Sequence, residues 1–349
     1  MKETSVVHNG KIAFTSNRSS KIGHMENYDI YTAEPDGSNL TRLTNSNHWE
    51  SRPIWSPDGT QMTFSDNRGD VGIPVMSAEG SNLRYIPTDP NITGSLNFFP
   101  TWSADGTKLA FSGRDSPDTP FDIFTMDLDG ANQINLTNTS NYSESDADFS
   151  PVGSQMCFLF GSDGPKPPSG MYLMRADGSD PTLLIEEGGQ CDWSPDGTKI
   201  VLGYSDFSGD TSDEGYGDSE VAVINADGSG LTNLTSNSVG DFKPRWSPDG
   251  TKITFMSDRS GDYDIYTMNA NGSNVAPVTT NPRWHDMDPD WQPVFTRKVV
   301  AMPEKQQEER QQNRQVHLKD TGGPSLLFIA SALLFSGGVM FYAGVQRRI

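Results

Sequence analysis

The feature that most limits what this chain can fold into is a short phrase that recurs along most of its length. The phrase is an aromatic residue followed by Ser-Pro-Asp-Gly or a close variant, and successive copies begin 44 to 53 residues apart. Five copies begin at Trp55, Trp102, Phe149, Trp193 and Trp246, and a sixth, shortened copy is Trp291-Gln292-Pro293. A constant period of this length predicts an array of similar structural units.

A second phrase, an acidic residue or Asn followed by Gly and Ser or Ala, lies between the copies of the first. It is centred on Gly37, Gly80, Gly130, Gly178, Gly228 and Gly272. Both phrases suit hairpin turns, because Pro presets φ, Asp bonds backbone amides and Gly takes the left-handed conformation. Strand-like stretches such as 252–256 and 263–268 lie between them. Four short strands in about 45 residues are typical of one propeller blade.

The two ends of the repeat region complement each other. Residues 11–14 match the second strand of the unit, so the first blade lacks its first strand. Residues 288–294 match a first strand with no strand after it. We therefore expect the last strand to complete the first blade and close the ring, which removes two exposed edges. The sequence predicts an all-β, six-bladed propeller of four-stranded blades over residues 11–295.

The composition agrees with an all-β fold and limits the classes of molecule that the protein could bind. With 34 Gly and 23 Pro the chain turns often, and its formal charge of −20 would repel the phosphates of nucleic acids. Its two cysteines, Cys157 and Cys191, form no zinc-binding pattern. We expect both to be small buried hydrophobes. They fall in neighbouring repeats, so a disulfide between them stays open.

The phrases W-S-P-D-G, D-I-Y-x-M and D-G-S-N-L resemble the repeats of TolB-like β-propellers, a WD-like repeat class. The resemblance covers residues 11–295 and implies a protein or peptide partner in the cell envelope, bound at the channel mouth. Blade four departs from the pattern, because Phe149 and Val152 replace Trp and Asp and residues 165–168 add prolines. In blade two Pro74 occupies the D-I-Y phrase, which predicts a distorted or peripheral strand.

Carboxylates occupy the position five residues before the aromatic residue in four of the six blades. Rotation of the ring should place these residues in a circle near the channel mouth, where they would bind Ca²⁺ or a cationic peptide. The other interpretation is that each acid caps its own turn through a backbone amide. We call this set the acid ring: Glu50, Asn97, Glu144, Gly188, Asp241 and Asp286.

The sequence contains no catalytic motif that we can identify. It has no G-x-S-x-G, no H-E-x-x-H and no phosphate loop, and its five histidines share no repeat position. We therefore expect a non-enzymatic binding or scaffolding module without a cofactor, apart from the calcium ion considered above. The alternative is a hydrolase or lyase with an acidic active site in the central channel.

After the repeats the composition changes to that of an anchored tail. Residues 296–324 are polar and predict a stalk, 325–345 are 21 residues without charge and predict a transmembrane helix, and 346–349 form a basic cytoplasmic tail. Leu318, Thr321 and Gly322 resemble the L-P-x-T-G sorting signal of Gram-positive surface proteins, with Lys319 in the proline position. The resemblance implies that a sortase cuts after Thr321 and joins the chain to the cell wall; the alternative is a membrane anchor alone.

The first ten residues contain no charged-then-apolar signal peptide. Export to the cell surface would therefore require a start codon upstream of Met1. Without one, the sequence predicts a tail-anchored protein with a cytoplasmic propeller.

Overall fold

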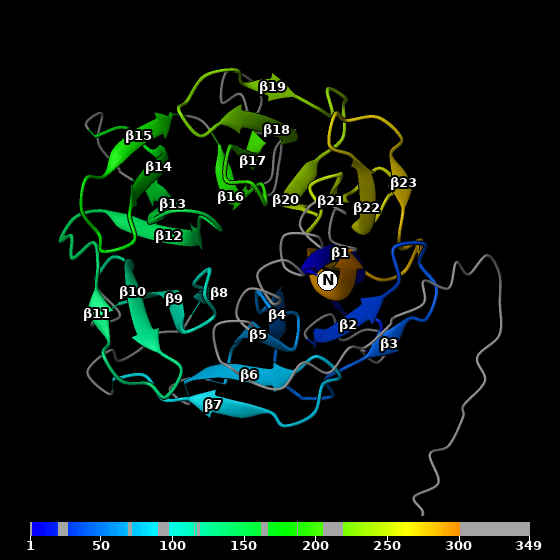
Figure 1. Ribbon diagram of the computed structural model, residues 1–349, viewed down its shortest axis with the longest axis horizontal. Helices are drawn as coiled ribbons and strands as arrows, with labels where there is room; N and C mark the ends of the chain where they lie inside the picture. Colours follow the sequence, from blue (N-terminus) through cyan, green and yellow to red (C-terminus); the bar gives the residue numbers. More distant parts are fainter. Residues whose placement is uncertain are drawn as a thin grey trace, which may run out of the picture. The chain divides into compact units, whose positions relative to one another are not determined.

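The computed structural model describes residues 2–19, 27–68, 72–89, 98–114, 116, 119–161, 167–186, 188–204 and 219–300. Residues 5–297 form one compact unit. In the described residues the strands make six four-stranded sheets arranged as a ring around a central axis (Figure 1). The expectation of an all-β, six-bladed propeller is confirmed.

In each blade the first strand named below lies nearest the central axis, and the last lies on the outside of the propeller. Blade one consists of β24 (Asp286–Val300), β1 (Lys2–Ser16), β2 (Asp29–Ala33) and β3 (Thr41–Arg42). Blade two consists of β4 (Glu50–Trp55), β5 (Gln61–Asp66), β6 (Ile73–Ser77) and β7 (Arg84–Ile86). Blade three consists of β8 (Phe98–Trp102), β9 (Lys108–Gly113), β10 (Asp122–Asp127) and β11 (Ile134–Asn135).

The second half of the ring repeats this order. Blade four consists of β12 (Ser143–Phe149), β13 (Gln155–Gly161), β14 (Gly170–Arg175) and β15 (Thr182–Ile185). Blade five consists of β16 (Gly189–Trp193), β17 (Lys199–Tyr204), β18 (Glu220–Asn225) and β19 (Thr232–Asn233). Blade six consists of β20 (Asp241–Trp246), β21 (Lys252–Ser257), β22 (Asp264–Asn269) and β23 (Ala276–Pro277).

The ring is closed by the pairing of the first and last strands. As expected, β24 lies beside β1 in blade one, and the His285 amide donates to the Asn17 side chain at 2.9 Å. Both strands run past the blade, because each supplies hydrogen-bond partners to the other: His8 Nε2 and Thr296 Oγ1 lie 2.7 Å apart. The expected propeller boundaries at 11 and 295 therefore cut through two continuous strands. We call the paired segments 5–10 and 292–297 the ribbon.

The Ser-Pro-Asp-Gly phrases close hairpins as predicted. In blade two Ser56 Oγ donates to Asp58 Oδ1 at 2.6 Å, and the Gly59 amide donates to the Ser56 carbonyl at 2.8 Å. Gly59 has a φ of 69°, and a Cβ there would lie 1.9 Å from the Pro293 carbonyl oxygen. Only glycine fits this turn without displacing the last strand.

The prediction for Pro74 is correct in one part and wrong in another. The described pairing between β5 and β6 ends at Val75, next to this residue, because proline has no amide hydrogen to donate. However, β6 is not peripheral: it is the third of four strands, and Pro74 pairs with Tyr85 of β7.

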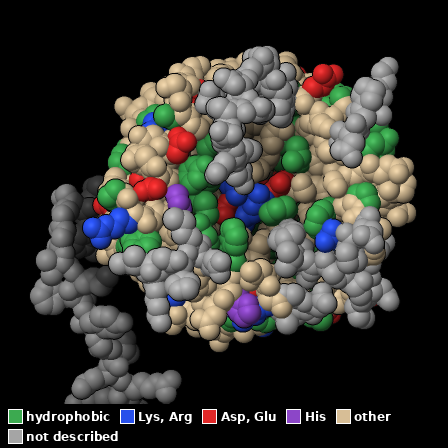
Figure 2. Space-filling view, turned by 180° about the vertical axis from the view of Figure 1, so that it is seen from behind, with side chains coloured by type: hydrophobic (Ala, Val, Ile, Leu, Met, Phe, Trp, Pro, Cys, Tyr) green, Lys and Arg blue, Asp and Glu red, His purple; other side chains and the backbone are tan. Residues whose placement is uncertain are grey.

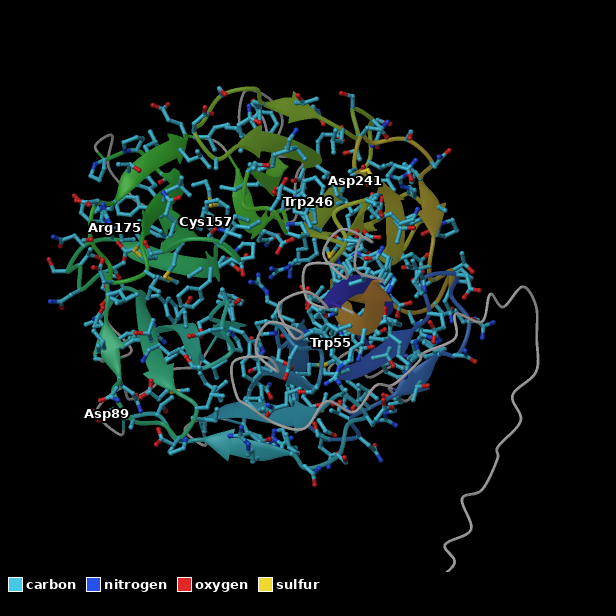
Figure 3. All side chains as sticks on the ribbon, viewed as in Figure 1. Trp55, Asp89, Cys157, Arg175, Asp241 and Trp246 are labelled. Atoms are coloured by element: carbon cyan, nitrogen blue, oxygen red, sulfur yellow. A yellow bond between two sulfur atoms is a disulfide. The ribbon has the colours of Figure 1, made fainter. Side chains whose placement is uncertain are left out.

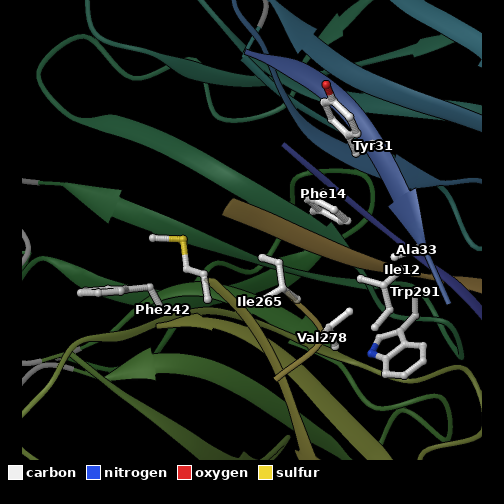
Figure 4. Packing of buried hydrophobic residues seen from close by; sticks show 9 residues of the cluster. Ile12, Phe14, Tyr31, Ala33, Phe242, Ile265, Val278 and Trp291 are labelled. Carbon is white, nitrogen blue, oxygen red and sulfur yellow. The ribbon is translucent and has the colours of Figure 1, made fainter. Parts of the chain in front are cut away.

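The hydrophobic core consists of six clusters, and each lies between two neighbouring blades. In the cluster at the closing junction, Phe14 and Trp291 of blade one pack with Phe242, Ile265 and Val278 of blade six (Figure 4). The other five junctions hold equivalent clusters. A blade therefore buries its apolar faces only when both neighbours are present.

The two cysteines form a disulfide between blades four and five. Cys157 lies in β13 and Cys191 in β16, and both side chains are buried. Their burial agrees with the expectation, and the disulfide that the sequence left open is formed because ring packing brings the two strands together at this junction. Here Gly188 occupies the acid-ring position and Gly170 begins β14, so these positions supply no polar side chain.

Within the part of the chain described here, no helix is long and apolar enough to cross a membrane. The segments predicted as stalk beyond Val300, sorting signal, transmembrane helix and basic tail lie outside the described residues.

Replacing Trp291 with Ala should destabilise the whole ring. Its side chain is only 3% exposed at the closing junction, and loss of such a large buried side chain costs about 3 to 5 kcal/mol. The free energy of unfolding in urea would measure this. Trp49→Ala is the matched control, because Trp49 is 45% exposed and its main contact is the Tyr28 ring; equal losses in both variants would contradict the interpretation.

Reduction of the Cys157–Cys191 bond should also destabilise the propeller. The bond joins residues 34 apart in sequence, and a loop of that size corresponds to about 3 to 4 kcal/mol in the chain-entropy model. Urea unfolding of the oxidised protein and of a Cys157→Ala/Cys191→Ala variant would show the difference. Identical midpoints would mean that junction packing alone holds blades four and five together.

Candidate functional site

A backbone irregularity in every innermost strand shapes the central channel. The third residue before the aromatic position has a positive φ of 48° to 62° in all six blades. Strand pairing shifts register at this point in the five blades whose pairing is given. A β-bulge of this kind turns a side chain in a new direction. We call these residues the waist: Arg52, Phe99, Asp146, Gln190, Lys243 and Asp288.

The bulge keeps the acid ring inside the blades, contrary to the expectation that it converges at the channel mouth. Glu50, Glu144, Asp241 and Asp286 are at most 1% exposed, and none of them lines either central cavity. Asn97 lies outside the described residues. No group of three or more His, Cys, Asp or Glu among the described residues is placed to hold a metal ion. Binding of calcium or another ligand by these residues stays a prediction.

Three acids of this ring have an arginine partner within their own blade. Arg68 lies 3.0 Å from Glu50, and Arg259 lies 2.7 Å from Asp241. Arg18 lies 2.5 Å from Asp286. Each arginine follows the second strand of its blade, which is a sequence signal that a search for carboxylates alone misses.

Glu144 is the exception, because no arginine accompanies it. Its carboxylate accepts from Thr139 Oγ1 at 3.0 and 3.1 Å, and it pairs across the strands with the hydrophobic Phe160. Burial raises the pKa of Glu144 to about 7, and the nearby charge of Asp122 adds to the shift. The carboxyl group is therefore protonated in much of the folded population near neutral pH.

Ion pairs between blades fill the waist of the channel. Arg52 of blade two pairs with Asp146 of blade four, and Lys243 of blade six pairs with Asp288 of blade one. The Arg52 guanidinium also lies 3.5 Å from the centre of the Phe99 ring. A space-filling view shows basic side chains at the centre of the ring, with acidic and hydrophobic ones beside them (Figure 2).

The charges of the waist balance one another. Burial lowers the pKa of Lys243, and the neighbouring Arg52 adds to the effect. Burial alone would raise the pKa of Asp288, but Lys243 and Arg52 outweigh it and hold that pKa below its ordinary value. Two cations thus face two anions here, and the waist presents no excess charge to a ligand.

A second layer, one residue before each aromatic position, is strongly acidic. We call it the floor: Ile54, Thr101, Asp148, Asp192, Arg245 and Asp290. Arg245 Nη1 lies 3.1 Å from Asp192 and 3.9 Å from Asp148. Asp148 and Asp192 lie within 4.0 Å of this guanidinium, and Asp290 feels its charge from farther away. Three carboxylates thus face one guanidinium, and the floor has an excess of two negative charges when all groups are ionised.

The floor carboxylates also join neighbouring blades. Asp192 of blade five accepts the Trp246 amide of blade six at 2.6 Å, and Asp290 of blade one accepts the Trp55 amide of blade two at 2.8 Å. Burial raises the pKa of Asp192 and of Asp290 to about 7, although Arg245 opposes the shift.

The floor forms the base of a cavity of about 320 Å³, which we call the chamber. Its walls are the aromatic residues of all six repeats, and its rim carries the prolines of the turns together with Val7 and Phe295 of the ribbon. Trp55 and Trp246 lie at the inner edge of the ring, whereas Asp89 and Arg175 lie at its outer edge (Figure 3). Sequence reasoning missed the floor and the waist, although charged residues recur at both positions.

Glu144→Gln should change how stability depends on pH. The folded pKa of Glu144 lies above its ordinary value of 4.5. The wild type therefore loses stability, at up to about 1 kcal/mol per pH unit, as pH rises between these two values. Glutamine keeps an acceptor for Thr139 and does not ionise. Urea unfolding from about pH 5 to about pH 8 should show the variant gaining on the wild type as pH rises, and parallel curves would contradict this. Glu79→Gln, which removes an exposed carboxylate, is the control.

Comparisons with known proteins agree with this architecture. Residues 8–191 and 189–333 match the family model of the TolB β-propeller domain. The TolB homolog of Chlorobium luteolum is 30% identical over 291 residues, which cover 82% of this chain and 60% of that protein. The chain thus spans less than two thirds of the length of this curated relative.

Two solved structures share the fold at lower identity. TolB from Acinetobacter baumannii has a TM-score of 0.66 and 20% identity, covering 81% of this chain and 66% of its own. An oligogalacturonate lyase in complex with manganese has a TM-score of 0.53 and 13% identity, covering 78% and 77%. The family match extends over most of the sequence and agrees with the motifs, the six blades and the closing strand, so this chain belongs to the TolB β-propeller domain family.

Proposed function

We propose that this chain is a non-enzymatic cell-envelope protein whose propeller lies outside the cytoplasm and binds a protein or peptide partner. The match to the TolB β-propeller domain supports this proposal. The buried disulfide supports it independently, because disulfides form and persist in oxidising compartments. The formal charge of −20 argues against a nucleic acid partner.

The proposal rests mainly on how the charged side chains of the channel are bonded. Those of the waist and most of those of the floor bond to another blade, either as ion pairs or as acceptors of a backbone amide. A nucleophile with an adjacent base would need groups that are free to exchange protons with a substrate. The channel is built instead as a rigid frame that presents a shaped, charged chamber, which suits binding.

One observation favours the alternative, a hydrolase or lyase with an acidic channel. Asp192 and Asp290 have raised pKa values in a concave site, which is a property of general acids. Both carboxylates, however, accept a tryptophan amide from the next blade. Protonation would weaken these bonds, so we assign the two aspartates to the frame.

We propose that the C-terminal segment holds the propeller at the cell surface. The uncharged residues 325–345 would cross the membrane, and Arg347 and Arg348 would stay in the cytoplasm. A sortase that accepts Leu318, Thr321 and Gly322 would move the protein to the cell wall. Without such processing the membrane helix alone would be the anchor.

Cross-linking in living cells should identify a partner at the chamber. A photo-reactive phenylalanine analogue at Ala104, an exposed residue of the chamber lining, should give a discrete protein adduct. The same group at Asp129, an exposed residue of the hairpin after β10, is the matched control and should not. Adducts that are absent or identical at both positions would overturn the proposal.

The location is tested on the same cells. Protease added to intact cells should cleave the propeller if it lies outside. If the propeller survives while known surface proteins are cut, the tail-anchored alternative with a cytoplasmic propeller replaces the surface location.

A further inference from the structure

The chamber opens in the middle of the ring, and residues from all six blades line it. Its volume of about 320 Å³ lies at the lower end of the range for sites that bind small ligands. It is too small for a folded domain and suits one long side chain with part of its backbone. Any protein partner would therefore insert a single residue.

The rim of the chamber is apolar and accessible. Phe295 of the ribbon lines this opening and is 51% exposed. Pro57, Pro195 and Pro248 of the hairpin turns lie on the same rim. Exposed apolar side chains around a concave opening are typical of an interaction site. The residues that flank the inserted one should therefore be apolar.

The floor determines the charge of the inserted residue. The waist holds two cations and two anions, whereas the floor holds three aspartates and only Arg245. Of these aspartates, Asp290 forms no ion pair within 4.0 Å among the described residues. When all three carboxylates are ionised, one positive charge brought into the chamber would offset half of the excess negative charge in a site of low dielectric constant.

The walls of the chamber favour arginine over lysine or a metal ion as the bound cation. The five tryptophans of the wall are only 3% to 9% exposed, so they offer an incoming cation an apolar surface rather than an open ring face. Arginine suits such a surface because its guanidinium is weakly hydrated and its planar fork bonds a carboxylate through two donors. The ammonium group of lysine is smaller and more strongly hydrated. The three floor aspartates are not placed to hold a metal ion. An arginine side chain fits both the walls and the floor.

We propose that the chamber binds an arginine side chain of the partner, presented by an extended segment with apolar neighbours, and that Asp290 receives the guanidinium. This inference rests on the proposed function, since it specifies what the partner inserts. It names the ligand chemistry of a site that the family match does not assign.

The test compares two peptides on the full-length protein. One is acetyl-Ala-Pro-Arg-Phe-Ala-amide, and the other has citrulline, a neutral isostere, in place of arginine. Tryptophan fluorescence reports binding, because tryptophans form the chamber walls. The arginine peptide should bind at least about tenfold more tightly. Its affinity should fall with added salt, whereas that of the citrulline peptide should not.

Two substitutions test whether Asp290 is the residue that causes the preference for the arginine peptide. Asp290→Asn keeps an oxygen for the Trp55 amide and should remove most of the preference for arginine. Asp129→Asn, which removes one exposed acid from an outer hairpin, should keep the preference in full. If Asp290→Asn unfolds, two measurements on the wild type replace it. The affinity for the arginine peptide should fall with added salt, and it should rise from about pH 6 to about pH 8 because ionised floor carboxylates bind the cation.

Several outcomes would overturn the inference. These are equal affinities for the two peptides, no saturable binding of the arginine peptide at millimolar concentration, or an undiminished preference in folded Asp290→Asn. If any of these occurs while the Ala104 cross-link still forms, the propeller binds a partner by other chemistry and the proposed function stands. If the Ala104 cross-link does not form but the arginine peptide is still preferred, the proposed function fails, and the preference of the chamber for arginine stands.

Discussion

No blade of this propeller can bury its own hydrophobic faces, and every other property of the structure depends on that constraint. The six core clusters lie between blades, and each takes side chains from two of them. An open array would leave two apolar faces in water, at roughly 25 cal/mol per Å² of exposed apolar surface. Closure by β24 removes both faces and both sheet edges together.

The polar interior follows from the same geometry. The innermost strands of all blades surround the axis, so their charged side chains lie close enough to bond to one another. The bulge in each strand sends one residue to the waist, and the next alternate residue reaches the floor. Most charges there find a partner on another blade, as Arg52 does with Asp146. Of the two channel layers, the waist has equal numbers of acids and bases, whereas acids outnumber bases in the floor of the chamber.

The repeat could be predicted from sequence because its turns are determined locally. Pro, Asp and Gly act within a few residues, so the hairpins, the blade count and the complementary ends were all accessible. The acid ring was expected at the channel mouth from the rotation of the ring alone, which relates equivalent residues but does not say how deep in a blade their side chains lie. The bulges at Arg52 and Lys243 did have a sequence signal, since each is followed by a proline, Pro53 or Pro244, and proline within a sheet is confined to edges and bulges. The pairing of Cys157 with Cys191 depends on the distance between two blades, which a single sequence does not contain.

The ribbon makes the starting point of the chain arbitrary. His8 and Thr296 touch, so the two ends of the propeller emerge side by side from one sheet. A short linker could join them, and new ends could be opened at an outer hairpin such as the one at Gly130, with every blade still holding four strands. The order of blades around the ring is fixed by packing, whereas the place where translation begins is not. Such a fold is free to be circularly permuted, and to move its chain ends, and whatever they carry, to another blade.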